Sequence, residues 1–201
     1  MIRVLIAEDM HLLREALVEL LALEDGVEVV AQVASGAEIV PAARRHRPDV
    51  AVVDIDLPGM DGVAAAAELR DRLPECRVLI LTALSRPGQL RRALAAGVAG
   101  FVPKDLRPAE LVAAIRTVAA GGQAVDPQLA VAALRSPPNP LTRRETEVLR
   151  LVATGAELAD VAGRMGLTYG TVRNYLTSSV AKLNARNRID AVRIAREAGW
   201  F

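Results

Sequence analysis

The chain has 201 residues, of which 52% are hydrophobic and 24% are charged, and its formal net charge at pH 7 is +1. This composition supplies enough apolar surface for an ordered globular protein and excludes wholesale disorder. The longest uninterrupted apolar stretch, Ala93 to Pro103, has 11 residues, whereas a membrane span needs about 20. Met1 to Ile6 run directly into a strand-like pattern without the features of a secretory signal, which predicts a cytoplasmic protein with no membrane partner.

Residues 1–123 alternate between strand-like and helical patterns. Short β-rich runs predict strands at Arg3–Ala7, Val27–Val33, Val50–Asp54, Arg77–Thr82 and Gly100–Val102. Helical patterns follow them near His11–Leu23, Ser35–His46, Asp61–Arg72, Arg86–Ala96 and Pro108–Ala120. This alternation predicts an α/β domain of (βα)5 type, with a doubly wound parallel sheet and helices on both faces. Functional groups of such a domain gather at the carboxyl ends of the strands.

The alternation stops after Gly121-Gly122, and a proline-rich segment follows at residues 135–140. Three prolines there remove backbone donors and restrict their neighbours, so the segment sustains neither a helix nor a sheet ladder. We therefore expect residues 124–139 to be a linker, with a short helix near Gln128–Leu134.

Residues 140–201 carry only helical patterns. Thr142 and Glu145 form a capping-box sequence that begins a first helix. Glycines then separate further helices near Glu157–Met165, Thr168–Leu183 and Ile189–Ala198. This part of the chain is expected to be a second, all-α domain of four helices.

Charge is distributed unevenly between the two predicted domains. Residues 1–123 carry 14 basic and 17 acidic side chains, for a net charge of −3, whereas residues 140–201 carry 10 and 6, for a net charge of +4. A basic second domain is consistent with nucleic-acid binding and equally with a solvated basic surface. Charge alone leaves both interpretations open.

Polar residues gather where the predicted strands of the first domain end. Glu8 and Asp9 follow the first strand, and Asp54 ends the third. Because parallel strands open on one edge, the three carboxylates are expected to come within reach of a single hard cation such as Mg²⁺. Thr82 ends the fourth strand and Lys104 follows the fifth, so that a hydroxyl and an ammonium join the same edge. These are the components of phosphoryl transfer to a carboxylate, with Asp54 as the nucleophile.

Four segments resemble the receiver domain of response regulators: Ala7–Asp9, Asp54–Gly62, Thr82-Ala83 and Phe101–Lys104. The resemblance covers residues 1–123 and implies a flavodoxin-like fold in which Asp54 accepts a phosphoryl group from a sensor histidine kinase. It implies that Glu8, Asp9 and Asp54 hold Mg²⁺ together with the main-chain carbonyl of Asp56. It also implies that Thr82 and Lys104 bind phosphoryl oxygens and that Phe101 is a switch residue, with a simple core role for Phe101 as the alternative.

An enzymatic alternative exists for the same segment. Asp54 and Asp56 also match the Asp-x-Asp of haloacid-dehalogenase-like phosphatases, in which the first Asp is phosphorylated and the second is a general acid. Those enzymes have Thr or Val two residues after the second Asp, where this chain has Pro58. The sequence therefore favours the receiver.

Three segments of the second domain resemble the LuxR-type helix-turn-helix: Leu141–Leu149, Thr171–Tyr175 and Lys182–Arg188. With the receiver, the whole chain resembles a NarL/FixJ-family response regulator, which is not an enzyme. Thr168 supplies an N-cap, and the helix that follows is expected to lie in the major groove of DNA. Residues 171–176 and 199–201 further resemble the DesR-like branch of this family.

The recognition helix offers two groups of predicted DNA contacts. Arg173, Asn174 and Thr177 fall on one helical face, and Arg and Asn side chains read guanine and adenine through paired hydrogen bonds. Thr171 and Lys182 are better suited to phosphate contacts, which position the helix without reading sequence. Glu157 stands where the family often has a Ser or Thr cap, so we expect a weaker cap there.

The resemblance implies a phosphorylation switch. Phosphorylated Asp54 is expected to favour a homodimer that presents two recognition helices to double-stranded promoter DNA, with RNA polymerase as an open further partner. The competing hypothesis is a phosphorylation-independent receiver that serves only as an interaction module. The intact set of Asp54, Thr82 and Lys104 argues against that hypothesis.

Overall fold

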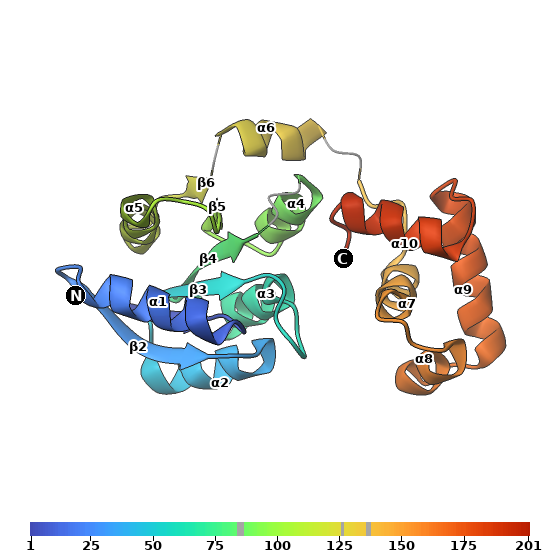
Figure 1. Cartoon of the computed structure of the whole chain (residues 1–201), viewed down its shortest axis with the longest axis horizontal. Coiled ribbons are helices and arrows are strands. Elements are labelled where there is room, and N and C mark those ends of the chain that lie inside the picture. The colour runs from blue at the N-terminus through green and yellow to red at the C-terminus, as the bar shows by residue number, and fades with distance from the viewer. Residues whose placement is uncertain (84–86, 126, 136–137) are drawn as a thin grey trace. The chain divides into compact units, whose positions relative to one another are not determined.

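The protein is described by a computed structural model that covers residues 1–83, 87–125, 127–135 and 138–201. It divides into two compact units, and each is described by itself (Figure 1). The helix α6 (Pro127–Arg135) spans the boundary between them, which falls after Ala132. This helix coincides with the short helix predicted within the linker. Positions 126, 136 and 137 of that predicted linker lie outside the described residues.

The first unit contains a six-stranded parallel sheet in the order β2-β1-β3-β4-β5-β6. The strands are β1 (Ile2–Ala7), β2 (Val27–Val33), β3 (Val50–Asp54), β4 (Arg77–Thr82), β5 (Gly100–Pro103) and β6 (Ala124–Val125). The first five match the predicted runs and confirm the α/β class of the fold.

The strand β6 was not predicted, and it corrects the expected count of five strands. Its two residues pair with Gly100 and Phe101 of β5, and the Ala124 N–H donates to the carbonyl of Ala99 at 3.0 Å. Gly121, at φ +93°, provides the turn that brings the chain back to the sheet after the preceding helix. A strand of two residues is too short to show an alternating pattern, so the sequence carried no signal for it.

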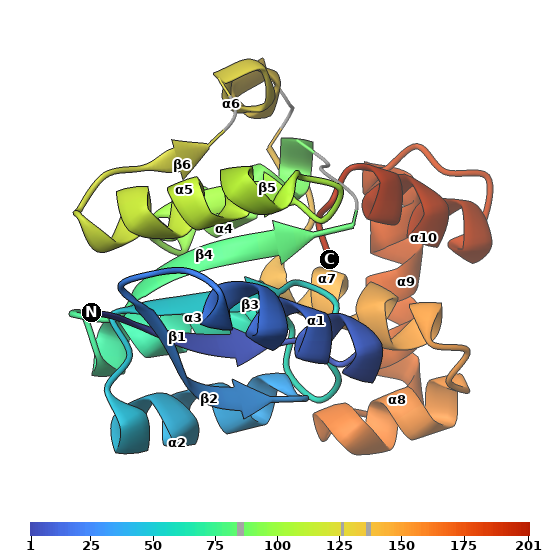
Figure 2. The same ribbon diagram turned by 60° about the vertical axis from the view of Figure 1, so that its left-hand side comes forward.

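Five helices flank the sheet of the first unit. They are α1 (His11–Ala22), α2 (Gly36–His46), α3 (Gly62–Arg72), α4 (Pro87–Ala95) and α5 (Pro108–Ala119). All five coincide with predicted helical segments, although the predicted start of the fourth at Arg86 lies outside the described residues. Figure 2 shows α1 and α5 in front of the sheet.

The strands bury side chains on both faces, which explains their nearly continuous apolar sequences. One cluster packs alternate strand residues against α1 and α5, and includes Val4, Ile6, Leu17, Leu21, Val50, Val52, Leu79, Leu81, Leu111, Ile115 and Val118. The intervening residues, among them Leu5, Val53 and Ile80, are fully buried toward the other face, which α2, α3 and α4 cover.

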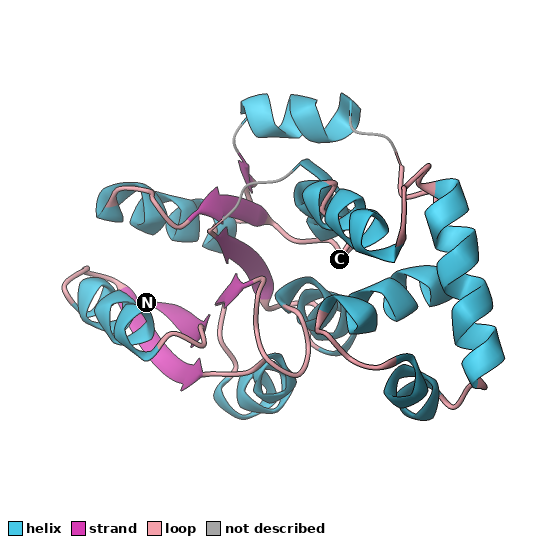
Figure 3. Ribbon diagram, turned by 45° about the vertical axis from the view of Figure 1, so that its right-hand side comes forward, coloured by secondary structure: helices cyan, strands magenta, loops and turns pink. Residues whose placement is uncertain are grey.

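The second unit is all-helical, with α7 (Arg143–Ala153), α8 (Leu158–Met165), α9 (Tyr169–Lys182) and α10 (Arg188–Glu197). Figure 3 shows only helices and loops in this part of the chain. Its core contains Val148, Leu149, Val161, Val172, Leu176, Leu183, Ala191 and Ala195. The predicted capping box is present, because Thr142 Oγ1 accepts from the Glu145 N–H and Glu145 accepts from the Thr142 N–H. Among the residues that the structure describes, no helix is both long and apolar enough to span a membrane.

Candidate functional sites: an acidic pocket and an exposed recognition helix

The three predicted carboxylates meet at the carboxyl edge of the sheet. Glu8 and Asp9 follow β1, Asp54 ends the adjacent β3, and one carboxylate oxygen from each lies within 4.8 Å of the others. Glu8 is fully buried and Asp54 is 4% exposed, whereas Asp9 is open to solvent. The neighbouring strands therefore bring together residues that are 45 positions apart in sequence.

Lys104 joins this cluster from the end of β5. Its ammonium Nζ lies 2.7 Å from Glu8 Oε2 and 3.1 Å from Asp54 Oδ2. The backbone N–H of Lys104 also donates to the backbone carbonyl of Thr82 at 2.8 Å, which fixes the lysine to the end of β4. The Lys104 ammonium thus contacts two of the three carboxylates.

Burial and charge set the protonation of this cluster. Burial raises the pKa of Asp54 above its usual range, and the neighbouring Lys104 ammonium partly offsets that rise. Burial likewise raises the pKa of Glu8, with Lys104 again opposing it. Burial opposes the charged form of Lys104, but its contacts with Glu8 and Asp54 outweigh that effect and raise its pKa. The lysine is therefore protonated at neutral pH.

Thr82 and Phe101 are both fully buried. Thr82 ends β4 in register with Pro103, and Phe101 pairs with Ile80 in the middle of the sheet. Phe101 packs as a core residue in this structure, and its burial on β5, the strand that leads to Lys104, is compatible with either predicted role. Asp56 is exposed, and its carboxylate is not part of the three-residue cluster.

A close backbone approach shapes the loop between β3 and α3. A Cβ added at Gly62 would lie 1.9 Å from the carbonyl oxygen of Asp54, so only glycine fits there. The Gly62 N–H donates to the Ile55 carbonyl at 2.9 Å, and Asp61 caps α3 by accepting from the Ala64 N–H. The loop thus returns directly behind Asp54 and leaves the carboxylate facing the edge of the sheet.

This donor set suits Mg²⁺. Hard divalent cations prefer carboxylate and carbonyl oxygens, and Mg²⁺ in proteins often keeps several waters and uses only one or two carboxylates. The exposed Asp9 gives solvent access to the cluster, while buried Glu8 and Asp54 supply charge that Lys104 only partly balances. The residues present therefore fit the ion that the sequence predicted.

In the second unit, α9 exposes the face that was predicted to contact DNA. Arg173, Asn174 and Thr177 are exposed, and Thr177 Oγ1 donates back to the Arg173 carbonyl at 3.0 Å. Within the described part of the chain, the Arg173 guanidinium has no ion-pair partner, so its donors face solvent. The opposite stripe of α9, with Val172, Leu176 and Leu183, packs in the core as predicted.

The two predicted phosphate contacts lie in different environments. Thr171 belongs to the start of α9, where its N–H donates to the Thr168 cap and the two hydroxyls lie 2.9 Å apart. Lys182 Nζ instead forms an ion pair with the buried Glu145 at 2.7 Å, although the lysine side chain is 37% exposed. Ser178 also donates to Glu145, at 2.6 Å. Any phosphate contact of Lys182 would therefore have to share its ammonium with Glu145.

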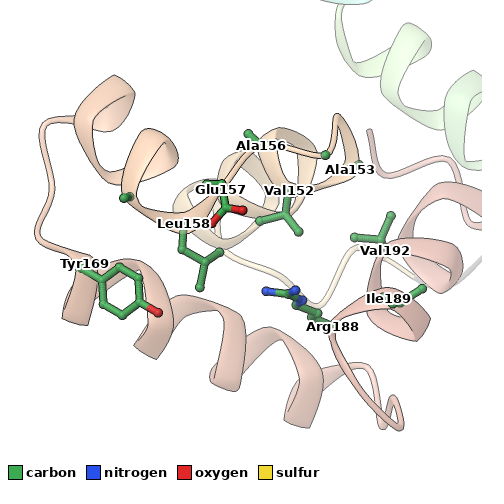
Figure 4. Close-up of a pocket in the computed structure, with 11 residues that line it drawn as sticks. Val152, Ala153, Ala156, Glu157, Leu158, Tyr169, Arg188, Ile189 and Val192 are labelled. Carbon is green, nitrogen blue, oxygen red and sulfur yellow. The ribbon is translucent and has the colours of Figure 1, made fainter.

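Tyr169, the first residue of α9, was not among the predicted contacts. Its side chain is 55% exposed and lies at the rim of a pocket of about 440 Å³ formed by the ends of α7, α8 and α10 (Figure 4). Leu158 and Arg188 line the same pocket. The N-terminal position of Tyr169, one helical turn before Arg173, could have marked it as a candidate contact. Glu157 precedes α8 without a side-chain cap bond, as predicted.

Comparison with known proteins identifies the class to which this combination belongs. Residues 4–116 match the family described as response regulator receiver domain, and residues 139–195 match the bacterial regulatory proteins of the luxR family. Fold and sites together define a transcriptional response regulator. More particularly, the chain belongs to the NarL/FixJ family of two-component response regulators, which regulate transcription and are not enzymes. This assignment excludes the phosphatase alternative.

The similarity to individual relatives extends over the whole chain. The transcriptional regulatory protein DesR of Bacillus subtilis (strain 168) is 44% identical over 201 residues, covering all of both chains. The DNA-binding transcriptional activator DevR/DosR of Mycobacterium tuberculosis is 34% identical, covering 98% of this chain and 95% of that protein.

Solved structures agree with the fold. A LuxR-family response regulator from Aurantimonas sp. SI85-9A1 is 33% identical, with a TM-score of 0.62 over 66% of this chain and 94% of that chain. RcsB of Salmonella enterica serovar Typhimurium, solved bound to promoter rprA with a phosphomimetic, has a TM-score of 0.73 at 21% identity. Its match covers 96% of this chain and 97% of that chain, and it shows the fold alone.

Proposed function

We propose that Asp54 accepts a phosphoryl group from the histidine of a sensor kinase, and that this modification controls DNA binding. The observation that carries the proposal is the position of Asp54, nearly buried at the end of β3 with Lys104 Nζ 3.1 Å from its Oδ2. We propose the same three parts as the sequence predicted, a receiver at 1–123, a linker at 124–139 and a DNA-binding domain at 140–201. The strand β6 extends the sheet of the receiver into the first two residues of that linker.

In the proposed transfer, an Asp54 carboxylate oxygen attacks phosphorus and forms the P–O bond of an acyl phosphate. The P–N bond to the kinase histidine breaks, and its electron pair stays on the imidazole nitrogen. Glu8, Asp9, Asp54 and the carbonyl of Asp56 would hold Mg²⁺, which when bound offsets the negative charge of the phosphoryl group. Lys104 binds a phosphoryl oxygen by charge, and the Thr82 hydroxyl binds another by hydrogen bonding.

The phosphoryl group on Asp54 would carry a charge of about −1.5 to −2 at pH 7. We propose that Thr82 and Lys104 meet this charge and that Phe101 repacks with them. Together these shifts bias a pre-existing equilibrium toward a dimer. The dimer presents two copies of α9 to promoter DNA in the cytoplasm, with half-sites about 10 bp apart. Support comes from the LuxR-type domain and from the full-length similarity to DevR/DosR, whose name states DNA binding.

Within the DNA interface, we propose Arg173 and Asn174 as base contacts, with Thr177 on the same face of α9. We propose Thr171 and Lys182 as contacts to DNA phosphates. Exposure of the first three on one face of α9 supports this arrangement. Tyr169 joins the set because recognition helices place their N-terminal residues at base edges.

Intact mass after incubation with acetyl phosphate and Mg²⁺ tests the proposal. One added phosphoryl group is expected on the wild-type chain and on Asp71→Ala, in which a carboxylate that is 70% exposed is removed from α3. None is expected on Asp54→Ala. Size exclusion of the same samples should show a shift toward dimer only where phosphate is added. DNA binding by an unmodified chain that never accepts phosphate would favour the phosphorylation-independent hypothesis instead.

A further inference from the structure

The loop that carries Glu8 and Asp9 enters α1 without the usual helix cap. The residue at the N-cap is Met10, whose side chain makes no cap hydrogen bond, and the first turn of α1 contains no acidic residue. A Ser, Thr, Asp or Asn at that position would normally hold the loop against the first turn. The backbone of Glu8 and Asp9 is therefore held by other contacts, one of which is the hydrogen bond from the Glu8 N–H to the Val33 carbonyl at 3.1 Å.

Arg14, the fourth residue of α1, contacts the main-chain carbonyls of this loop. Its Nη1 donates to the carbonyl of Glu8 at 2.6 Å and lies 3.4 Å from the carbonyl of Asp9. The contact with Glu8 is partly buried, which favours a strong charge-assisted hydrogen bond. One guanidinium thus reaches both main-chain carbonyls of the acidic pair.

The two carboxylates differ in how far they depend on this support. The Glu8 side chain is fixed independently, by Lys104 Nζ at 2.7 Å and by the Met10 N–H at 3.2 Å. Within the described residues, the exposed Asp9 carboxylate has no hydrogen bond that would orient it. The backbone that Arg14 contacts sets the position of the Asp9 Cα and Cβ, and so the distance over which its carboxylate can reach the cluster.

We propose that Arg14 is a positioning residue for the divalent cation site, acting through the backbone of Glu8 and Asp9. This inference rests on the proposed Mg²⁺ site and adds to it a residue outside the cluster. Groups that orient metal ligands typically affect metal affinity by 10-fold or more when they are removed. Arg14→Ala should therefore weaken Mg²⁺ binding on the order of 10-fold.

Calorimetric titration of the full chain with MgCl₂ tests the inference without any phosphodonor. Arg14→Lys should show an intermediate loss, because a lysine offers one ammonium where arginine offers a fork of donors. The matched control is Arg116→Ala. Arg116 also donates to a carboxylate and a carbonyl, those of Glu24 at 3.1 Å and Asp25 at 3.2 Å, but at the other end of α1. Its removal should leave Mg²⁺ affinity unchanged.

A second readout separates positioning from general stability. The rate of phosphorylation by acetyl phosphate should reach half-maximum at a higher Mg²⁺ concentration in Arg14→Ala, with a plateau near that of the wild type. Thermal unfolding without Mg²⁺ is measured in parallel. Should Arg14→Ala melt early, Arg14→Lys decides by the same titration.

The outcomes distinguish this inference from the proposed function. If the wild type binds Mg²⁺ and both Arg14 variants bind it equally well, the inference is overturned while the Mg²⁺ site stands. If Arg116→Ala loses affinity as strongly as Arg14→Ala, a general effect on α1 replaces the specific role. If the wild type does not bind Mg²⁺ at all, both the site and the inference fall.

Discussion

Replacing Glu145 with glutamine should destabilise the helical unit substantially. Glu145 side-chain oxygens accept from the Thr142 N–H and from the Ser178 hydroxyl and pair with the Lys182 ammonium, while the side chain itself is only 4% exposed. Glutamine preserves the shape of the side chain but removes its charge and turns an NH₂ group toward one of these donors. The Lys182 ammonium then loses its partner.

The pKa of Glu145 gives the scale of the effect. Burial opposes ionisation, but the hydrogen bonds from Lys182, Ser178 and Thr142 outweigh it and lower the pKa from 4.5 to about 2. At about 1.4 kcal/mol per pKa unit, this difference corresponds to about 3 kcal/mol of stabilisation at neutral pH. The partial exposure of Lys182 reduces the expected loss to about 2–3 kcal/mol.

The pH dependence follows from the direction of that shift. Because the pKa in the folded state lies below the unfolded value, the stabilisation is fully present above about pH 4.5 and is lost as the pH falls toward about 2. The difference in unfolding free energy between wild type and Glu145→Gln should therefore be largest at pH 7 and shrink below pH 4.5.

Trp200 makes the measurement specific to one unit. It is the single tryptophan of the chain and packs against the core of the helical unit, so urea unfolding followed by its fluorescence reports on that unit. Glu147→Gln is the control, because Glu147 lies on the same helix in an exposed pair with Arg144 at 3.3 Å. Such pairs contribute little. Equal midpoints for the two variants at pH 7 would refute the importance of the Glu145 cluster.

Three further outcomes are expected. Arg173→Ala should weaken binding to the preferred promoter site by about 1–3 kcal/mol and relax preference at one base pair, whereas a uniform loss across sequences in gel-shift assays would make Arg173 a phosphate contact. Gly62→Ala should lower the free energy of unfolding by at least about 2–3 kcal/mol in thermal unfolding, because its Cβ would meet the Asp54 carbonyl oxygen at 1.9 Å. Gly163→Ala is the control: its Cβ would have no atom within 4 Å, so the same measurement should show unchanged or increased stability. Burial raises the pKa of the Cys76 thiol to about 12, so iodoacetamide at pH 8 should label only unfolded protein, and rapid labelling of the native chain would contradict this burial.

The acidic pocket could be predicted because strand ends in a parallel sheet share one edge. Glu8, Asp54 and Lys104 each stand at the end of a run that reads as a strand, so topology alone brings them together. The exposed face of α9 was predictable for a similar reason, since helical spacing separates Arg173 and Thr177 from the apolar stripe.

Side-chain contacts between residues that are far apart in sequence and related by no periodic pattern were not predictable. The pair of Glu145 with Lys182 joins residues 37 positions apart on different helices, and no periodicity in the sequence relates them. Sequence reasoning assigned Lys182 to DNA and used Glu145 only as a cap. The reach of Arg14 back to the loop before its own helix was equally hidden, because it depends on a side-chain conformation and on the missing cap at Met10.

The two edges of the sheet limit how copies of this protein can assemble. At one edge, β6 is only two residues long, which is too short to template another strand. At the other edge, the register of β2 against β1 shifts between Val29 and Ala31, so that Val30 forms a bulge and interrupts a regular ladder. Both features disfavour growth of a continuous sheet from one molecule into the next. A dimer of receiver units is therefore expected to join through helix surfaces, and strand-mediated aggregation is suppressed at both ends of the sheet.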